Sequence, residues 1–514
     1  MIPCDSGRTE RCPVNTPSIS QWPVRQAARS PESVATVFDG VQRSYAEFDT
    51  DIARAAAALR ARGIGHGDRV ALLSANHPAH IDLFFACGRL GAILVPLNAR
   101  LSENEIAHCL SDSGTALLVT SAELAGRGTP AAEQAGTREV IDLAAWTQLC
   151  AETDPDRDEP RGTGDDPCMI MYTSGTTGRP KGAVLTHSSV TFATLNAALD
   201  LGLTGRDVSL ACAPLYHTAA FFMGATPTLL RGGTVIIQDG FEPGRVLAQI
   251  EADRISYGFG VPVMLDMLSR HPDWDRTDLT SLRVFTVGGA PVRLDTLHTW
   301  LARDVAVCQG YGLTESGPGA LVLTPEQAKD KVGSAGLPHL FTEVRIAGLD
   351  DAPVTPGERG EIQVRGPNVM AGYWNNPGAT AAAFAPDGWL RTGDVGVADD
   401  DGFITVVDRL KDMFISGGEN VYPAEVEAAI IELPGVLEAA VLGVPDERWG
   451  ETGLALIRLA DGAELTAEAL ADQLAGRLAR YKIPRRLQIV DSIPRNPTGK
   501  ILKSRIRTTL EVDQ

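Results

Sequence analysis

A run rich in hydroxyl side chains and glycines is the part of this sequence best suited to chemistry. It reads Tyr172-Thr173-Ser174-Gly175-Thr176-Thr177-Gly178-Arg179-Pro180-Lys181-Gly182. Glycines let backbone amides approach a phosphate, hydroxyls donate hydrogen bonds to it, and a lysine supplies positive charge. No Gly-Lys-Ser/Thr ends the run, so it is not a Walker loop. Because apolar stretches flank it, we interpret it as a phosphate-binding loop on a sheet edge rather than a flexible polar loop.

Four further strings combine glycine with charged or hydroxyl residues. They are Gly310-Tyr311-Gly312-Leu313-Thr314-Glu315-Ser316, Trp389-Leu390-Arg391-Thr392-Gly393-Asp394, the stretch 408–427 with Gly417-Gly418-Glu419-Asn420, and Arg495-Asn496-Pro497-Thr498-Gly499-Lys500.

These five strings, in this order, resemble the motifs of the adenylate-forming superfamily. That superfamily includes acyl-CoA synthetases, peptide-synthetase adenylation domains and beetle luciferases, and the likeness covers nearly the whole chain. It implies activation of a carboxylic acid with ATP as its acyl-adenylate, followed by transfer of the acyl group to coenzyme A. The cofactors implied are ATP, Mg²⁺ and coenzyme A.

The resemblance also implies a role for each matched residue. Lys500 would bridge the carboxylate and the α-phosphate, Thr314 would contact that phosphate, and Glu315 would hold Mg²⁺. Carboxylate attack on a phosphate brings anions together, so charge neutralisation must dominate the catalysis. The cofactor-binding residues predicted in this way are Thr173, Ser174, Gly175, Thr176, Thr177, Gly178, Lys181, Gly289, Ala290, Pro291, Tyr311, Gly312, Asp394, Arg409, Gly417, Gly418 and Glu419.

Several of these roles follow the chemistry of the side chain. Tyr311 offers a flat face for adenine, and Gly289-Ala290-Pro291 forms a slot against the other side of the base. Asp394 suits two ribose hydroxyls, and Arg409 adds a ribose or phosphate contact. Lys181 is either a partner of the β- and γ-phosphates or a solvated loop residue.

A second set of residues is assigned to the thioester-forming step. In the superfamily the small C-terminal lobe rotates about a hinge, here Lys411, and replaces the Lys500 loop with the loop that contains Gly417 and Gly418. A thiol on a pantetheine arm can then attack the adenylate. The alternative for Lys411 is an exposed turn lysine.

The acid itself is only loosely indicated. Amino-acid-activating relatives carry an Asp close to the position of His217, so its absence favours a simple carboxylic acid. His217 orients the carboxylate, gates the thiol tunnel, or is a packed core histidine. We expect Phe221, Gly258 and Gly260 to border the acyl group, and small residues here suggest a bulky aromatic, alicyclic or polycyclic acid as readily as a fatty chain.

The elements that position these residues follow from hydrophobic periodicity. Helices over 45–62 and 81–90 alternate with apolar strands over 69–73 and 92–96, which predicts a mostly parallel sheet covered by helices on both faces. Strands over 360–364 and 403–407 follow, then a helix over 423–432, strands over 437–442 and 454–459, and a helix over 467–479. We predict an α/β fold with an N-terminal ATP- and acid-binding domain of several subdomains (residues 1–408), a hinge (409–412) and a mobile α+β lobe (413–514).

Composition excludes several other classes of protein. The 514 residues carry 46 basic and 65 acidic side chains, a net charge of −19, which argues against a nucleic-acid partner. No apolar run approaches a membrane span and no signal peptide is evident, so we expect a cytoplasmic protein. The eight cysteines are scattered and indicate neither zinc nor disulfides.

Two alternatives to a free-standing acyl-CoA synthetase stay open. The acceptor could be the pantetheine arm of an acyl carrier protein instead of coenzyme A. A catalytically silent binder of acyl-adenylates is the alternative from another class, although such a binder would not need Lys500 and the whole phosphate loop.

Overall fold

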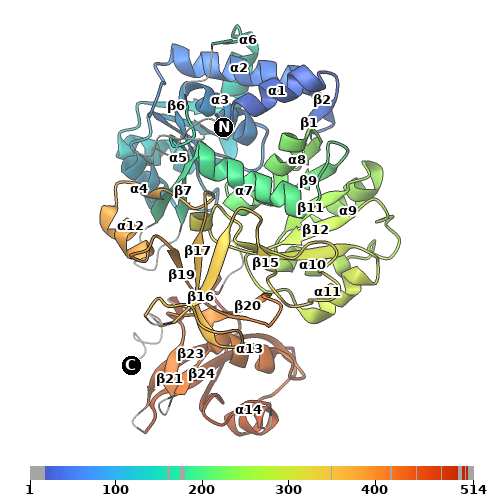
Figure 1. The fold of residues 1–514 in the computed structure, drawn as a ribbon, viewed down its shortest axis with the longest axis vertical. Coiled ribbons are helices and arrows are strands. Elements are labelled where there is room, and N and C mark those ends of the chain that lie inside the picture. Colours follow the sequence, from blue (N-terminus) through green and yellow to red (C-terminus); the bar gives the residue numbers. More distant parts are fainter. Residues whose placement is uncertain are drawn as a thin grey trace, which may run out of the picture.

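The computed structural model describes residues 18–158, 162–173, 180–348, 350–416, 419–446, 448–475, 477–495, 501–503 and 505–507. A large body that contains the N-terminal domain lies above a smaller C-terminal lobe (Figure 1). The chain crosses between them once, after strand β20 (Ile404–Arg409). The last described residues therefore belong to the small lobe.

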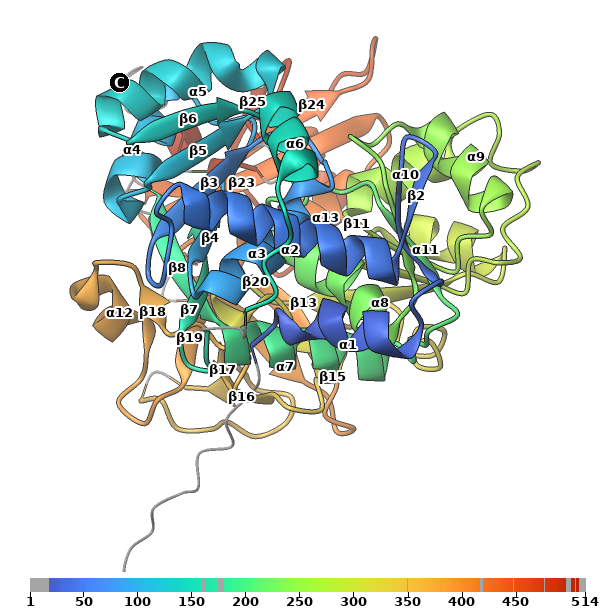
Figure 2. The ribbon, with the colours of Figure 1, turned by 90° about the horizontal axis from the view of Figure 1, so that it is seen from above.

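Two large sheets form the core of the body, and helices cover them (Figure 2). In the nine-stranded sheet the six neighbouring strands from β13 to β1 are parallel, and the edge strands are antiparallel. Its order is β15 (Leu337–Pro338), β14 (Leu321–Val322), β13 (Ala306–Tyr311), β12 (Val284–Val287), β11 (Tyr257–Gly260), β9 (Val208–Ala211), β10 (Thr234–Ile237), β1 (Val34–Phe38) and β2 (Val41–Ser44).

The seven-stranded sheet has the same mixed character. Its five strands from β7 to β6 are parallel, and β8 and β18 extend it antiparallel. Its order is β18 (Gly372–Tyr373), β8 (Lys181–Thr186), β7 (Pro167–Thr173), β4 (Ile93–Pro96), β3 (Arg69–Leu73), β5 (Leu117–Thr120) and β6 (Glu139–Asp142). The antiparallel pair β7–β8 brackets residues 174–180, so the predicted phosphate loop joins two paired strands at the end of this sheet.

The helices of the body connect the parallel strands. Helix α2 begins with a capping box, in which Glu47 N–H donates to Ser44 Oγ at 3.3 Å and Ser44 N–H donates to Glu47 Oε2 at 2.8 Å. The helices are α1 (Gln21–Arg29), α2 (Tyr45–Ala61), α3 (Ala79–Leu90), α4 (Glu103–Ser113), α5 (Ala122–Ala135), α6 (Leu143–Glu152), α7 (His187–Asp200), α8 (Thr226–Arg231), α9 (Pro243–Ala252), α10 (Pro262–Ser269), α11 (Leu294–Leu301) and α12 (Pro377–Ala383). The helices predicted over 45–62 and 81–90 match α2 and α3, and the strand predicted over 69–73 is β3.

A four-stranded antiparallel sheet joins the body to the small lobe. Its order is β16 (Glu343–Ala347), β17 (Arg359–Arg365), β19 (Leu390–Ala398) and β20. Beyond it, the lobe contains β21 (Phe414–Ser416), β22 (Glu419–Val421), α13 (Pro423–Ile431), β23 (Val436–Asp446), β24 (Gly450–Leu459), α14 (Ala467–Leu474) and β25 (Arg486–Ile489). Buried apolar side chains of this lobe pack into clusters of their own.

The predicted α/β fold with a small α+β lobe is confirmed. One helix was predicted too long: α14 ends at Leu474 instead of Ala479, because Ala475 adopts extended backbone angles (φ −61°, ψ 130°). No helix in the described part of the chain is long and apolar enough to cross a membrane. The boundaries at 408 and 412 stay predictions.

Candidate functional site

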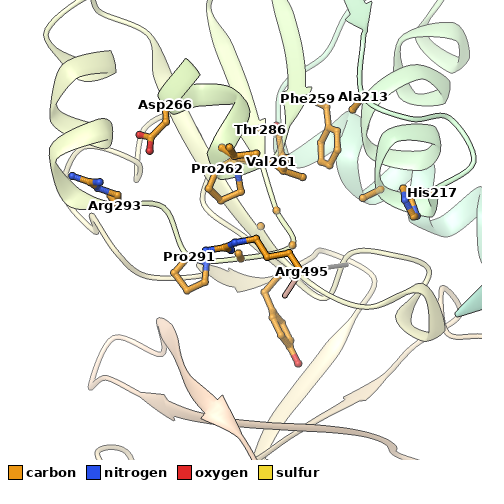
Figure 3. Close-up of a pocket in the computed structure, with 18 of the residues that line it drawn as sticks. Ala213, His217, Phe259, Val261, Pro262, Asp266, Thr286, Pro291, Arg293 and Arg495 are labelled. Carbon is orange, nitrogen blue, oxygen red and sulfur yellow. The ribbon is translucent and has the colours of Figure 1, made fainter. Parts of the chain in front are cut away.

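A cavity of about 950 Å³ lies between the body and the small lobe. Strands β11 and β12 and the segment 310–314 form its upper wall, and α13, β23 and Arg495 of the lobe close it from below. Figure 3 shows His217, Phe259, Thr286, Pro291 and Arg495 around this space. Both lobes therefore contribute to a single site.

The carboxylate of Glu315, next in the chain to the cavity-lining Thr314, is held by two hydroxyl groups. Thr173 Oγ1 donates to Glu315 Oε1 at 3.2 Å, and Tyr373 Oη donates to the same oxygen at 2.8 Å. Burial and the charge of Glu315 raise the pKa of Tyr373, so its hydroxyl stays protonated and donates. Three segments that are distant in the sequence thus meet at one acidic oxygen.

The turn that presents Thr314 and Glu315 is fixed by hydrogen bonds from neighbouring side chains and by a close backbone approach at Gly312. A short 3₁₀ helix spans Thr314–Ser316, Leu313 N–H donates to Ser316 Oγ at 2.9 Å, and Asn368 Nδ2 donates to the carbonyl of Ser316 at 2.6 Å. A Cβ atom on Gly312 would lie 1.7 Å from the carbonyl oxygen of Pro318, so only glycine fits there. The hydroxyl of Thr314 lies 3.3 Å from that of Thr218.

Tyr311, Asp394 and Arg409 form a second polar group on the cavity side of the connecting sheet. Tyr311 Oη donates to Asp394 Oδ2 at 2.9 Å, and Arg409 Nε lies 3.1 Å from Asp394 Oδ1. Asp394 and Arg409 are paired directly across β19 and β20. Burial, followed by the charge of Asp394, raises the pKa of Tyr311. The three residues that the sequence assigned to adenine and ribose therefore lie together.

Of the remaining residues predicted to bind the nucleotide, some are described by the structure and others lie outside the described residues. Gly289, Ala290 and Pro291 line the cavity, as the predicted adenine slot requires. Lys181 Nζ lies 4.8 Å above the ring of Tyr373, within reach of the Glu315 group. Outside the described residues lie Ser174, Gly175, Thr176, Thr177, Gly178, Gly417, Gly418 and Lys500.

Three predicted residues around the hinge and the thiol path are described. Glu419 is exposed on β22, and Lys411 is exposed in the turn after β20. Partial burial, and next the charge of Arg409, lower the pKa of Lys411. His217 lines the cavity, and burial together with the charge of Arg100 lowers its pKa to about 4. The imidazole is therefore neutral at pH 7.

The predicted acyl-pocket residues Phe221, Gly258 and Gly260 are not among the residues that line this cavity, and their place at the acyl group stays a prediction. A Cβ atom on Gly258 would lie 2.7 Å from the ring of Phe285, and one on Gly260 would lie 3.0 Å from it. Phe221 is buried and packs against Phe84 with ring centroids 5.1 Å apart. Successive residues of a strand face opposite sides, so it is Phe259 that faces the cavity.

Several residues of the site were missed because no motif contains them. Tyr373 and Asn368 are distant from every recognised string, and their contacts with the 310–316 turn appear only in the folded chain. Phe259 and Val261 line the cavity and stand next to the two glycines that were chosen instead. The period-2 alternation of strand β11, had the strand been recognised in the sequence, could have identified Phe259.

The donor set suits Mg²⁺ bound mainly by phosphate oxygens. Among the described residues no group of three or more His, Cys, Asp or Glu side chains could hold a metal ion. Glu315 supplies one carboxylate, and hydroxyls surround it. Mg²⁺ is commonly held by one or two carboxylates together with substrate phosphates and water. Glu315 therefore fits the role that the sequence assigned to it.

Comparisons with known families match both lobes. The family described as "AMP-binding enzyme" matches residues 24–374, and the family described as "AMP-binding enzyme C-terminal domain" matches residues 425–500. The first match alone spans more than half of the chain and includes the segments that hold Thr173, Tyr311, Glu315 and Tyr373.

The chain is similar to several characterised proteins along almost its whole length. It is 48% identical to a feruloyl-CoA synthase of an Amycolatopsis species, over 95% of this chain and 98% of the relative. It is 40% identical to a long-chain-fatty-acid–CoA ligase of Mycobacterium tuberculosis, over 95% and 97%. The o-succinylbenzoate coenzyme A synthetase of Bacillus subtilis, solved with ATP and magnesium ion, is 34% identical with a TM-score of 0.85, covering 96% of this chain and 100% of that one.

Proposed function

Because the chain belongs to the AMP-binding enzyme family, we propose that it activates an aromatic carboxylic acid with ATP and transfers the acyl group to coenzyme A. The broader predictions, an acyl-CoA synthetase and an AMP-forming acid–thiol ligase, are confirmed by the relatives. The aromatic acid and the individual roles of the residues are the proposed part.

The Glu315 group carries this proposal. Thr173 and Tyr373 donate to the Glu315 carboxylate, Lys181 lies over the ring of Tyr373, and Thr314 lies on the adjacent backbone, so charge and hydrogen bonds converge beside the cavity-lining Thr314. Bound Mg²⁺ would neutralise charge on the phosphates. Lys500 would then add the positive charge that the attacking carboxylate and the α-phosphate both need.

At the same end of the cavity, Asp394 and Tyr311 would bind the nucleoside. Asp394 is buried, and its Oδ1 and Oδ2 atoms contact Arg409 and Tyr311 respectively. A carboxylate oriented in this way can also accept hydrogen bonds from ribose hydroxyls. Tyr311 and the slot 289–291 both line the cavity and would enclose the adenine ring.

For the second half-reaction we propose rotation of the small lobe about a hinge at residues 409–412, between units 1–408 and 413–514. Gly417, Gly418 and Glu419 would then contact the pantetheine arm. The neutral imidazole of His217 lies on the cavity wall, where it can accept or donate a hydrogen bond without adding charge. Lys411 would act as a conformational pivot instead of a chemical group.

The apolar wall of the cavity supports a ring-bearing acid. Phe259, Val261, Pro262 and Met223 line it, and aromatic and aliphatic side chains of this kind bind a flat apolar ring. The relative at 48% identity is named a feruloyl-CoA synthase, which supports a substituted phenylpropenoic acid of that size. A fatty acid is the competing substrate, from the relative at 40% identity.

The test is a panel of acids in two assays. Acid-dependent exchange of pyrophosphate into ATP reports adenylation, and thioester formation with coenzyme A or with a phosphopantetheinylated carrier protein reports the acceptor. We expect phenylpropenoic acids to give higher kcat/KM than saturated fatty acids, and coenzyme A to accept the acyl group. If none of the acids supported pyrophosphate exchange, the proposal would be refuted. If the acyl group were transferred only to the carrier protein, the carrier protein would replace coenzyme A as the proposed acceptor. Cytoplasmic residence, which we also propose, is tested by cell fractionation.

A further inference from the structure

Helix α13 begins at the junction between body and lobe, and a buried carboxylate of the body contacts its first turn. Asp408, near the end of β20, accepts the backbone N–H of Ala424 at 2.6 Å through Oδ2 and that of Arg409 at 2.6 Å through Oδ1. The side chain is buried, and its burial raises the pKa while the Ala424 N–H and Lys503 oppose that rise. A carboxylate at a helix N-terminus also interacts favourably with the helix dipole.

A second charged group of the body contacts the same turn from another strand. The guanidinium of Arg359, at the start of β17, lies 4.9 Å from the ring centroid of Tyr422. Arg359 Nη2 also lies 3.5 Å from Glu425 Oε2. Strand β19 lies between β17 and β20 in this sheet. Arg359 and Asp408 therefore contact the first turn of α13 from two separate strands of one sheet.

Inside the lobe, α13 is connected to the segment that follows residues 496–500. Glu427 Oε1 accepts a hydrogen bond from Val441 N–H at 2.7 Å, and Lys503 Nζ lies 2.7 Å from the same oxygen. The side chain of Lys503 is only 11% exposed, so this ion pair is protected from solvent. Fixing the first turn of α13 therefore fixes the rest of the lobe.

The position of Arg495 indicates which half-reaction this lobe orientation serves. Arg495 lines the cavity and directly precedes the segment with Lys500. Its backbone pairs with Ile501, which follows that segment. None of the described residues of β21 and β22, which flank Gly417 and Gly418, lines the cavity. The orientation therefore matches adenylation and not thioester formation.

We propose that Asp408 and Arg359 are positioning residues that clasp the first turn of α13 and hold the lobe in its adenylating orientation. This inference rests on the proposed function, since it assumes two orientations that alternate about Lys411. Rotation at Lys411 would leave Asp408 and Arg359 on the body and carry Tyr422, Ala424 and Glu425 away. The clasp must then open before the thioester step, so its strength sets the balance between the two states.

The test separates the two half-reactions in Asp408→Ala and Arg359→Ala. We expect the first-turnover release of pyrophosphate to slow about tenfold in each, because a charge-assisted contact of one orientation is lost. The thioester step from supplied acyl-adenylate should not slow, because the clasp is open in that step. Asp408→Asn keeps the size of the side chain but loses its charge. Its rate of pyrophosphate release should lie between those of the unmodified enzyme and Asp408→Ala.

Matched controls keep the same chemistry inside the body. Arg345 also lies over an aromatic ring, that of Trp389 at 4.6 Å, and pairs with a carboxylate, that of Asp387 at 2.7 Å. Asp401 pairs with Lys331 at 2.7 Å, just before β20. Arg345→Ala and Asp401→Asn should leave the ratio of the two half-reactions unchanged.

Cleavage by trypsin after the exposed Lys411 gives a readout that does not need the substrate. We expect faster cleavage in Asp408→Ala and Arg359→Ala than in their controls, because the clasp restrains the hinge. Equal loss of both half-reactions with a lower Tm, or an unchanged ratio with unchanged cleavage, would overturn the clasp. If none of the acids supported pyrophosphate exchange by the unmodified protein, the proposed function would fail. The cleavage rates would still show whether Asp408 and Arg359 restrain the hinge.

Discussion

The two ends of the cavity are built in different ways. At the nucleotide end, polar side chains hold one another: Thr173 and Tyr373 bind Glu315, and Tyr311 and Arg409 contact Asp394. At the proposed acyl end, the wall includes apolar side chains such as Phe259, Val261 and Pro262, and the face of the strand decides that Phe259 reaches the cavity.

This difference separates what is common to a family from what distinguishes its members. A polar constellation tolerates little change, because a buried group that loses its partner costs about 1–3 kcal/mol. An apolar wall accepts substitutions of similar volume at lower cost. Changes at the nucleotide end should therefore reduce activity with every acid, whereas changes at the acyl end should alter the choice among acids.

Lys500→Ala should give the largest effect and belongs to the nucleotide end. Loss of a charge that stabilises the transition state should lower the adenylation rate by about 10²–10³-fold with every acid. Thioester formation from supplied acyl-adenylate should persist, because the loop is expected to leave the site in that step. Rapid-quench measurement of each half-reaction checks this, and equal losses would contradict the two-orientation scheme.

Asp394→Asn should give the next largest effect, again independent of the acid. The amide keeps the shape but loses the charge that Arg409 and Tyr311 contact, so we expect the KM for ATP to rise about 10–100-fold. The relative kcat/KM values for two different acids should not change. A change in that ratio would mean that the two ends of the cavity are coupled.

Phe259→Ala should do the reverse and act on the choice of acid. Removing a ring from the cavity wall should lower kcat/KM for a ring-bearing acid about tenfold relative to a short linear acid, with the KM for ATP unchanged.

Gly260→Leu is the matched comparison on the opposite face of the same strand. Its side chain would collide with Phe285, so it should lower the Tm and affect all acids alike. Selective rejection of bulky acids by Gly260→Leu would instead support the prediction that Gly260 borders the acyl group.

These residues also show how far sequence reasoning reached. Tyr311, Glu315 and Asp394 were predicted because short strings fix both the residue type and the local backbone, as the close approach at Gly312 and the Leu313–Ser316 hydrogen bond illustrate. Gly258 and Gly260 lie against Phe285 instead of on the cavity wall, because a glycine-rich strand does not reveal which face it turns to a cavity. Tyr373, Asn368 and the clasp on α13 depend on contacts between distant segments, and such contacts leave no local pattern.

The smallest effect concerns His217, which lines the cavity. Burial and the charge of Arg100 lower its pKa to about 4 from the ordinary value of 6.5. The unfolded chain therefore binds a proton at this residue between pH 6.5 and 4 while the folded chain does not, so His217 costs stability as the pH falls through that window. His217→Gln should remove this cost and preserve on the order of 1–2 kcal/mol of unfolding free energy at pH 5 relative to pH 7. Urea titrations at both pH values measure the difference, and the exposed His298 provides the matched control as His298→Gln. The same pH dependence in His217→Gln as in the unmodified enzyme would show that water reaches the imidazole. The side chain of His217 would then be more exposed than its lowered pKa indicates.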